Sequence, residues 1–528
     1  MRLCLVAFSL LVARVQSQLS TPSSGFALED LAVRGCLKYP EAEMPKGFEA
    51  CLFNFDLVDP RGLYMSAKSG ETLLVVDRTG RRSGKIIAMW DDDNDLRNNV
   101  TERVELFAGD LALSHGIAVC GDYLFASSDS QVYRWPYTAG QREPLDDDRR
   151  QVVITNVNAD GSGGAPRGHH TRTLLCDDRD NTLYVSIGSR GNLDRSSYRA
   201  RIRRFSAEDM MRETVEPEGG MDFADGYVFA DGLRNTVGIA WDLDGKMWGV
   251  NNGMDNLFVE DLGGDIHEDN PGEELNDFPE EKAGSFYGYP QCWSEGNLDT
   301  GRGEGTQWVH PSFSDEYSDE WCRDPGNNVR PRLLMQAHTA PLGLEFFGER
   351  YPSTPCAALD GSIHYANPVY SDTGTIRNTT GDGDGDGTAD GGLRYPLDQT
   401  AFPCSMYGDI FVALHGSWNR PVAVGFSIIH IPMRVDGMPR GDIKEFFRRE
   451  GADTRGAEWP TDMRPVDVVF DKHGRLYMSS DKSGEILLIH HVADEPEPPV
   501  AYTMNTNGDQ EQDGDGERPR RRRRLRYR

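Results

Sequence analysis

Histidine and arginine side chains recur along the chain, each just ahead of a short segment rich in β-forming residues. They are Arg61, His115, His169 or His170, Arg234, His338 and Arg464. If these groups meet in the fold, they form a cationic pocket for an anionic ligand, in which a neutral imidazole could accept a substrate proton. The alternative is a set of separate, solvated loop residues. Arginine is rarely buried without a partner, so the recurrence favours the pocket.

A second candidate site is the acidic run Gly381-Asp-Gly-Asp-Gly-Asp-Gly-Thr-Ala-Asp390. Its Asp-x-Asp-x-Asp-Gly start is typical of a calcium loop, with Asp382, Asp384, Asp386 and Asp390 as ligands. Leu393 stands where such a loop carries its glutamate, so an acidic surface loop without metal is the alternative. The run Asp91-Asp-Asp-Asn-Asp95 is interpreted as a solvated turn.

Several other enzyme classes lack their motifs in this sequence. No Gly-x-Gly-x-x-Gly lies between a predicted strand and a predicted helix, which disfavours a nicotinamide-binding domain. There is no Gly-x-Ser-x-Gly nucleophile elbow. The absence of a Cys-x-x-Cys pair argues against a zinc site or a thiol redox motif.

The elements that would position the histidines and arginines are repeated β-hairpins. The segments His115–Ser128, Thr171–Gly188, Val237–Gly253 and Val466–Ser480 share one pattern. Each has a β-rich run, a turn with Asp, Gly or Asn, and an apolar pair that ends in an aromatic residue. Three of the aromatic anchors, Phe125, Tyr184 and Trp248, lie about 60 residues apart, which suits one four-stranded propeller blade.

Six blades fit the chain best. Leu73–Val76 with Ile86–Met89 supplies the first blade, and Leu344–Phe347 with Asp409–Ala413 supplies a later one. Residues 257–335 are poor in repeats, which leaves seven blades as an alternative. The predicted fold is all-β, a six-bladed β-propeller with four-stranded antiparallel blades. In such a fold the innermost strands would bring their polar ends to one axial mouth.

The two ends of the chain differ in composition from the predicted propeller, which covers residues 18–495. Residues 1–17 have the pattern of a signal peptide, with Arg2, the apolar run Leu3–Ala13 and a small-residue cleavage site. Residues 496–528 are predicted to be a disordered tail, acidic and then arginine-rich, which either binds polyanions or stays solvated. We therefore expect a secreted protein.

Secretion gives the cysteines a structural role. Removal of Cys4 leaves eight of the 9 cysteines, an even number that predicts four disulfides, with Cys36–Cys51 and Cys292–Cys322 as local pairs. Asn99 and Asn378 begin glycosylation sequences. The net charge of −29 disfavours nucleic acid as a partner. After the N-terminal segment, no stretch is apolar enough to predict a membrane span.

Several motifs resemble one known family, the secreted quinoprotein glucose/sorbosone and pyranose dehydrogenases. They are Gly168-His-His-Thr-Arg-Thr173, Gly232-Leu-Arg-Asn235, Asn270-Pro-Gly-Glu-Glu-Leu-Asn276, Tyr287-Gly-Tyr-Pro290 and His415-Gly-Ser-Trp-Asn-Arg420. The matches run in order from about residue 60 to about residue 490. The resemblance implies that the chain oxidises a sugar, using pyrroloquinoline quinone (PQQ) and a calcium ion (Ca2+).

The resemblance also implies roles for individual residues. His169 would be the general base, with His170 as the competing assignment because the doubled histidine leaves the alignment open by one residue. Arg234 would act at the quinone carbonyl, and the backbone carbonyls of Gly253 and Met254 would hold the calcium ion. Other cofactor contacts are implied for Asn235, for Asn252 in place of a longer glutamine, and for His338, His415, Arg420 and Arg464.

The chemistry of these residue types agrees with such a ligand. PQQ carries three carboxylates, which the guanidinium groups of Arg234, Arg420 and Arg464 can pair in bidentate fashion. The rival hypotheses are a calcium-dependent lactonase or esterase propeller and a non-catalytic propeller that binds carbohydrate or protein. No haem-attachment motif is present, so we expect the electrons to pass to a separate cytochrome or small mediator.

Overall fold

The structure is a computed structural model, and the residues that it describes are 35–492, except residues 40–41, 66–70, 158–167, 197, 213–218, 300, 349–355, 358–394, 397–399, 435 and 450–462. The predicted signal peptide, the tail and the acidic run with Asp382, Asp384, Asp386 and Asp390 lie outside these residues. No helix in the described part is both long and apolar enough to cross a membrane.

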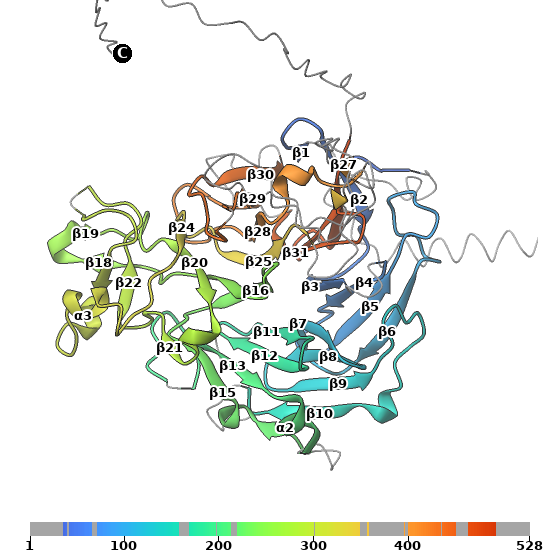
Figure 1. Ribbon diagram of the computed structural model, residues 1–528, viewed down its shortest axis with the longest axis horizontal. Helices are drawn as coiled ribbons and strands as arrows, with labels where there is room; N and C mark the ends of the chain where they lie inside the picture. Colours follow the sequence, from blue (N-terminus) through green and yellow to red (C-terminus); the bar gives the residue numbers. More distant parts are fainter. Residues whose placement is uncertain are drawn as a thin grey trace, which may run out of the picture. The chain divides into compact units, whose positions relative to one another are not determined.

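Six antiparallel sheets surround one axis and form a six-bladed β-propeller (Figure 1), which confirms the predicted fold. From the axis outward the first three blades are β3 (Pro60–Met65), β4 (Leu73–Asp77), β5 (Gly84–Met89) and β6 (Arg103–Gly109); β7 (Leu113–Cys120), β8 (Tyr123–Ser128), β9 (Val132–Pro136) and β10 (Gln151–Thr155); and β11 (Arg172–Asp177), β12 (Thr182–Ile187), β13 (Arg201–Phe205) and β15 (Tyr227–Asp231). The other three blades are β16 (Thr236–Trp241), β17 (Met247–Asn251), β20 (Glu273–Phe278) and β24 (Leu333–Met335); β25 (Pro341–Phe346), β28 (Ile410–Leu414), β29 (Ser427–Ile431) and β30 (Lys444–Arg449); and β31 (Pro465–Phe470), β32 (Leu476–Ser480), β33 (Glu485–His491) and β2 (Phe48–Asn54).

Short elements extend or connect the blades. The strands β1 (Ala42–Glu43), β14 (Met221–Asp222) and β21 (Ser285–Phe286) pair with outer strands, whereas β18 (Phe258–Val259) with β19 (Gly264–Asp265), β22 (Cys292–Ser294) with β23 (Gln307–Val309), and β26 (Cys356–Ala357) with β27 (Tyr395–Pro396) form separate two-stranded sheets. The helices α2 (Ala207–Arg212) and α3 (Asp319–Arg323) lie in connections. The repeat-poor residues 257–335 therefore hold two small hairpins and the outer strands of the fourth blade rather than a seventh blade.

The sixth blade joins the two ends of the propeller. Its inner three strands come from residues 465–491, and its outermost strand, β2, comes from the N-terminal side (Figure 1). Ala50 pairs with Ile489 and Leu52 with Leu487, so this last strand is held by a backbone ladder. The disulfide Cys36–Cys51 attaches the preceding segment to β2, as predicted.

Glycine allows the innermost strands to approach one another at the axis. A Cβ atom on Gly62 would lie 2.0 Å from the carbonyl oxygen of His115, and one on Gly116 would lie 2.0 Å from that of Arg172. At the corresponding position of the innermost strand, the third to sixth blades carry Thr173, Gly238, Gly343 and Asp467, in that order. The glycine that follows Arg61 or His115 thus marks a close contact between neighbouring strands, and the arginine or histidine before it marks the polar end of its strand.

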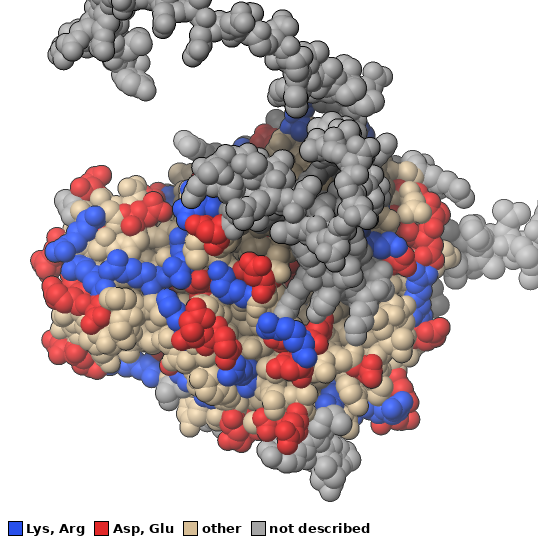
Figure 2. Space-filling model, in the orientation of Figure 1, with Lys and Arg blue, Asp and Glu red and all other residues tan. Residues whose placement is uncertain are grey.

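Serines on the second strands connect neighbouring blades. The hydroxyls of Ser127, Ser186 and Ser479 donate to the backbone carbonyls of Arg172, Thr236 and Arg61, each on the innermost strand of the next blade. The disulfide Cys120–Cys176 joins β7 to β11, and Cys292–Cys322 closes the fourth blade's insertion as predicted. Cys404 is also disulfide-bonded. On the face shown in Figure 2, basic and acidic side chains are interspersed.

Candidate functional site

The predicted polar residues belong to one end of the axis, where the innermost strands begin, but they do not share one register. Arg61 and His115 lie within β3 and β7, whereas Arg234, His338 and Arg464 precede their strands by one to three residues. At the register of Arg61 and His115, the third blade carries Arg172, which the sequence analysis did not include.

His169 is held in one ring orientation by Ser189. Its Nδ1 lies 3.1 Å from the Ser189 carbonyl oxygen and 3.0 Å from the Ser189 Oγ. Burial and the nearby Arg234 lower the pKa of His169 to about 3, so the imidazole is neutral at ordinary pH. A neutral ring that donates Nδ1–H to the carbonyl keeps its lone pair on Nε2.

His170 differs from His169 because both of its ring nitrogens have partners. Its Nδ1 lies 3.1 Å from the Gly168 carbonyl oxygen, and its Nε2 lies 3.0 Å from Nη1 of Arg78. A guanidinium can only donate, so the His170 Nε2 lone pair is occupied. The geometry therefore favours His169 over His170 as a proton acceptor.

Arg234 lies beside His169 and is paired with Asp255. Its Nη2 donates to the Asp255 Oδ2 over 2.6 Å and to the Asn192 Oδ1 over 3.2 Å. The other Asp255 oxygen accepts from Asn419 Nδ2 at 3.3 Å and lies 3.7 Å from Nδ1 of His338. Asp255 thus connects predicted site residues from the fourth and fifth blades.

The loop His415–Arg420 spans the site. At its far end, Arg420 Nη1 donates to the backbone carbonyl of Glu268 and lies 3.3 Å from the Asp269 Oδ1. At its near end, His415 Nε2 lies 3.0 Å from the Asp481 Oδ2. The loop therefore links the Asp255 group to a second group of charges around Asp481.

Asp481 accepts hydrogen bonds from Arg61, one of the predicted cationic residues, and from His415, a predicted cofactor contact. It forms an ion pair with Arg61 as well as its contact with His415. Burial opposes ionisation of Asp481, but His415 and Arg61 outweigh it and lower the pKa of this carboxyl. Arg464 donates to the backbone carbonyls of His415 (2.9 Å) and Gly416 (2.7 Å), which fixes the start of the same loop.

The segment predicted to bind calcium is held by side chains around it. Asn235 Nδ2 donates to the Asn252 Oδ1, and Asn252 Nδ2 donates to the Pro341 carbonyl, both over 2.8 Å. The Gly253 amide donates to the Glu273 Oε2 over 2.6 Å, and burial raises the pKa of Glu273 to about 7. Within the described part of the chain, the carbonyl oxygens of Gly253 and Met254 accept no hydrogen bond.

Unpaired polar atoms around the mouth fit an anionic cofactor and a metal. Among the described residues, Arg61 Nε, Arg420 Nε and Asn235 Oδ1 are buried without a hydrogen-bond partner. Two guanidinium donors and two free backbone carbonyls complement carboxylates and calcium, respectively. The residues present thus suit the groups that the sequence analysis expected.

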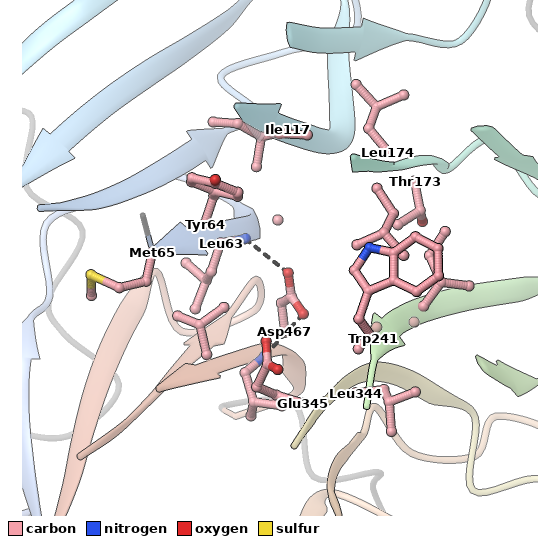
Figure 3. Close-up of a pocket in the computed structure, with 18 of the residues that line it drawn as sticks. Leu63, Tyr64, Met65, Ile117, Thr173, Leu174, Trp241, Leu344, Glu345 and Asp467 are labelled. Atoms are coloured by element: carbon pink, nitrogen blue, oxygen red, sulfur yellow. Dashed lines mark hydrogen bonds between the residues drawn. The ribbon is translucent and has the colours of Figure 1, made fainter. Parts of the chain in front are cut away.

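Below the mouth the axis opens into a cavity of about 220 Å³, which lies among all six innermost strands (Figure 3). Val237, Leu342 and Val466 pack against one another beside this channel. The side chains of Glu345 and Asp467 face the cavity, and the Leu63 amide donates to Asp467 over 2.8 Å. Burial raises the pKa of Asp467 to about 7.

The structure gathers the expected residues into two connected groups. One contains His169, Arg234, Asn235, Asn252, Gly253, His338 and Arg420, and the other contains His415 and Arg464. Met254 lies between Gly253 and Asp255, with its side chain packed in an apolar cluster. Sequence reasoning missed Asp255, Glu273 and Asp481. Two of these had a signal, since Asp255 directly follows the predicted calcium carbonyls and Glu273 stands in the Asn-Pro-Gly-Glu motif.

Comparison with known proteins places these observations in a family. The model of the TrAA12-like family matches residues 42–492. A "Pyrroloquinoline quinone-dependent sugar dehydrogenase" of Hypocrea jecorina (strain QM6a) is 29% identical over 480 residues, which is 87% of this chain and 91% of the relative. A "Pyrroloquinoline quinone-dependent pyranose dehydrogenase" of Coprinopsis cinerea is 26% identical over 483 residues, 86% of this chain, and the match covers 55% of that relative.

Solved structures show the same similarity. The calcium structure of Trichoderma reesei Carbohydrate-Active Enzymes Family AA12 has a TM-score of 0.64 and 26% identity, and the match covers 87% of this chain and 99% of that one. The holo form of the pyranose dehydrogenase PQQ domain from Coprinopsis cinerea has a TM-score of 0.63 and 25% identity, with 85% and 97% covered.

Proposed function

This chain belongs to the TrAA12-like family, and from that premise we propose that it oxidises a sugar with PQQ as its cofactor and a calcium ion beside it. Two relatives are named PQQ-dependent sugar and pyranose dehydrogenases. Structures of similar proteins include a calcium form and a holo PQQ domain. The fold, the family and the residue types at the mouth support the same reaction class.

One observation carries the proposal beyond the family: the environment of His169. Its ring donates Nδ1–H to Ser189 and is buried beside Arg234. A neutral imidazole that donates Nδ1–H keeps its lone pair on Nε2, to which no described residue is bonded, and a general base needs such a lone pair to accept a proton. We assign His169 the removal of the proton from the sugar hydroxyl that is oxidised.

The other residues bind and orient. When bound, PQQ supplies the acceptor for the hydride lost by the sugar, and calcium polarises that acceptor. The carbonyls of Gly253 and Met254 would hold the calcium ion, while Arg234 and Asn235 would face the developing negative charge. The guanidinium groups of Arg420 and Arg464, with Arg61, His338 and His415, would surround the carboxylates of the cofactor.

We further propose that the protein acts outside the cell and passes its electrons to a separate acceptor. The N-terminal signal pattern and the disulfides Cys36–Cys51, Cys120–Cys176 and Cys292–Cys322 support an oxidising compartment. The acceptor would be a cytochrome or a small mediator, because the sequence has no haem-attachment motif.

Reconstitution tests the proposal. Purified protein, stripped with a chelator and supplied with PQQ and calcium, should reduce an artificial dye in the presence of an aldose or a ketose. Protein that lacks either addition is the control and should stay inactive. PQQ titration without saturable binding would refute the dehydrogenase, and ester hydrolysis with calcium alone would support the rival lactonase.

A further inference from the structure

Glu273 connects two loops of the mouth through backbone hydrogen bonds. It is the first residue of β20, it is 3% exposed, and its two carboxylate oxygens bind different loops. Oε2 accepts from the Gly253 amide at 2.6 Å, and Oε1 accepts from the Ala340 amide at 3.3 Å. We propose that Glu273 is a positioning residue that holds the Gly253–Met254 loop in its calcium-binding conformation, an inference that rests on the proposed function.

The hydrogen bond to Gly253 controls the orientation of the predicted ligands. A peptide unit is planar, so the hydrogen bond to the Gly253 amide fixes the Asn252–Gly253 peptide plane. This plane directly precedes the peptide unit that contains the Gly253 carbonyl. The backbone of Gly253 passes close to Pro271, since a Cβ atom on this glycine would lie 2.9 Å from the Pro271 Cγ. Asn252 on one side and Asp255 on the other are bound to Pro341 and Asn192, respectively, so Glu273 supplies the contact in the middle of the segment.

The second oxygen of Glu273 extends this control to the next blade. Ala340 follows the segment of His338, a predicted cofactor contact, and directly precedes β25. One rigid carboxylate therefore sets the spacing between the loop predicted to hold calcium and the loop predicted to contact the cofactor. Groups that support the ligands of a metal without binding it commonly change metal affinity by 10- to 100-fold when altered.

Glu274, the next residue, offers a matched control. It is buried in the same strand, but its carboxylate accepts from the side chains of Ser294 (2.6 Å), Asn251 (3.0 Å) and Asn276 (3.2 Å). None of these donors is a backbone amide of a mouth loop. Glu273→Gln and Glu274→Gln therefore make the same carboxyl-to-amide change at neighbouring buried positions, and only the first changes a group that is bonded directly to the Gly253 and Ala340 amides.

The test measures calcium binding by calorimetry in the full chain, with and without PQQ. We expect Glu273→Gln to weaken calcium binding about 10- to 100-fold and Glu274→Gln to change it by less than about twofold. In the metal-free protein, hydrogen exchange should become faster at the Gly253 and Ala340 amides in Glu273→Gln alone. Melting curves of both variants separate these effects from a general loss of stability.

The outcomes distinguish this inference from the proposed function. Wild-type calcium affinity in Glu273→Gln or an equal loss in both variants would overturn the positioning role, whereas a wild type that binds no calcium would overturn the proposed function on which that role rests. Failure of PQQ to bind or of sugar to be oxidised by the wild type would likewise overturn the proposed function. If Glu273→Gln does not fold, Glu273→Asp, which keeps the charge but shortens the side chain, should weaken calcium binding and leave exchange faster at Gly253.

Discussion

At the scale of single residues, His169 and His170 show how hydrogen-bond partners distinguish two adjacent, identical side chains. An exposed imidazole has an ordinary pKa of about 6.5. Burial, together with the nearby Arg234, lowers the pKa of His169 to about 3. His169 therefore stays neutral across the range in which an exposed histidine would become protonated.

Substitution of the two histidines should separate their roles. His169→Ala is expected to lower kcat at least 100-fold, the usual range for a lost general base, with little change in PQQ affinity. His170→Ala removes the partner of Arg78 and should retain most activity. Steady-state dye reduction gives kcat, and absorbance titration gives PQQ affinity.

Arg464→Ala is the reciprocal control for these variants, because it should weaken PQQ binding more than it lowers kcat at saturating cofactor. If His169→Ala kept wild-type activity while His170→Ala lost it, the base would be His170. The proposed tautomer of His169 would then be irrelevant to the reaction.

At the scale of elements, the innermost strands combine close approach with one ionisable residue at the position of closest contact. Gly62, Gly116, Gly238 and Gly343 allow neighbouring strands to pack at the axis, whereas the sixth blade has Asp467 at this position. Its carboxylate accepts from the Leu63 amide and so joins the last blade to the first. The same contact places an ionisable group in the axial cavity.

This position predicts a pH dependence of stability. Because the pKa of Asp467 is raised to about 7, the folded state binds more protons than the unfolded state between pH 4 and 7, and stability falls as pH rises through that range. Asp467→Asn should remove this loss, so the variant should gain about 2 kcal/mol relative to wild type between pH 5 and pH 8, an amount reduced from the full shift because water can enter the cavity.

Urea unfolding at the two pH values measures this difference. The exposed Asp244→Asn on the β16–β17 turn is the control and should follow the wild type at both pH values. An equal pH slope in wild type and Asp467→Asn would show that Asp467 does not titrate in this range.

At the scale of the whole molecule, the ring of blades depends on a strand contributed by the opposite end of the chain. β2 completes the sheet of β31, β32 and β33, and the apolar cluster between the fifth and sixth blades includes Ala50 and Leu52 from it. Without β2, the edge of β33 would be unpaired and this cluster would be open to solvent.

Truncation tests this closure. Removal of residues 1–54 should abolish the cooperative thermal transition, measured by circular dichroism, because the sixth blade loses its outer strand. Removal of residues 1–34 keeps β2 and Cys36–Cys51 and should leave the transition close to that of the chain from residue 18. A stable propeller without residues 1–54 would show that β33 tolerates an open edge.

The repeated hairpins, a preference for six blades over seven and the residue types of the mouth could be predicted from the sequence alone. These features are local, since turn residues, alternating strands and short motifs such as Gly168–Thr173 are read over a few neighbouring positions. The disulfides Cys36–Cys51 and Cys292–Cys322 were predicted for the same reason, because their partners are near in sequence.

The contacts among the residues of the mouth, in contrast, depend on the tertiary structure. Asp255, Glu273 and Asp481 contact site residues from other blades, and Cys120 pairs with a cysteine 56 residues away, so no local pattern could assign their partners. The choice of His169 over His170 likewise depends on Ser189 and Arg78, which other strands and loops bring beside them. Hydrogen bonds and pKa values depend on distance in space, and the fold sets that distance between residues far apart in the chain.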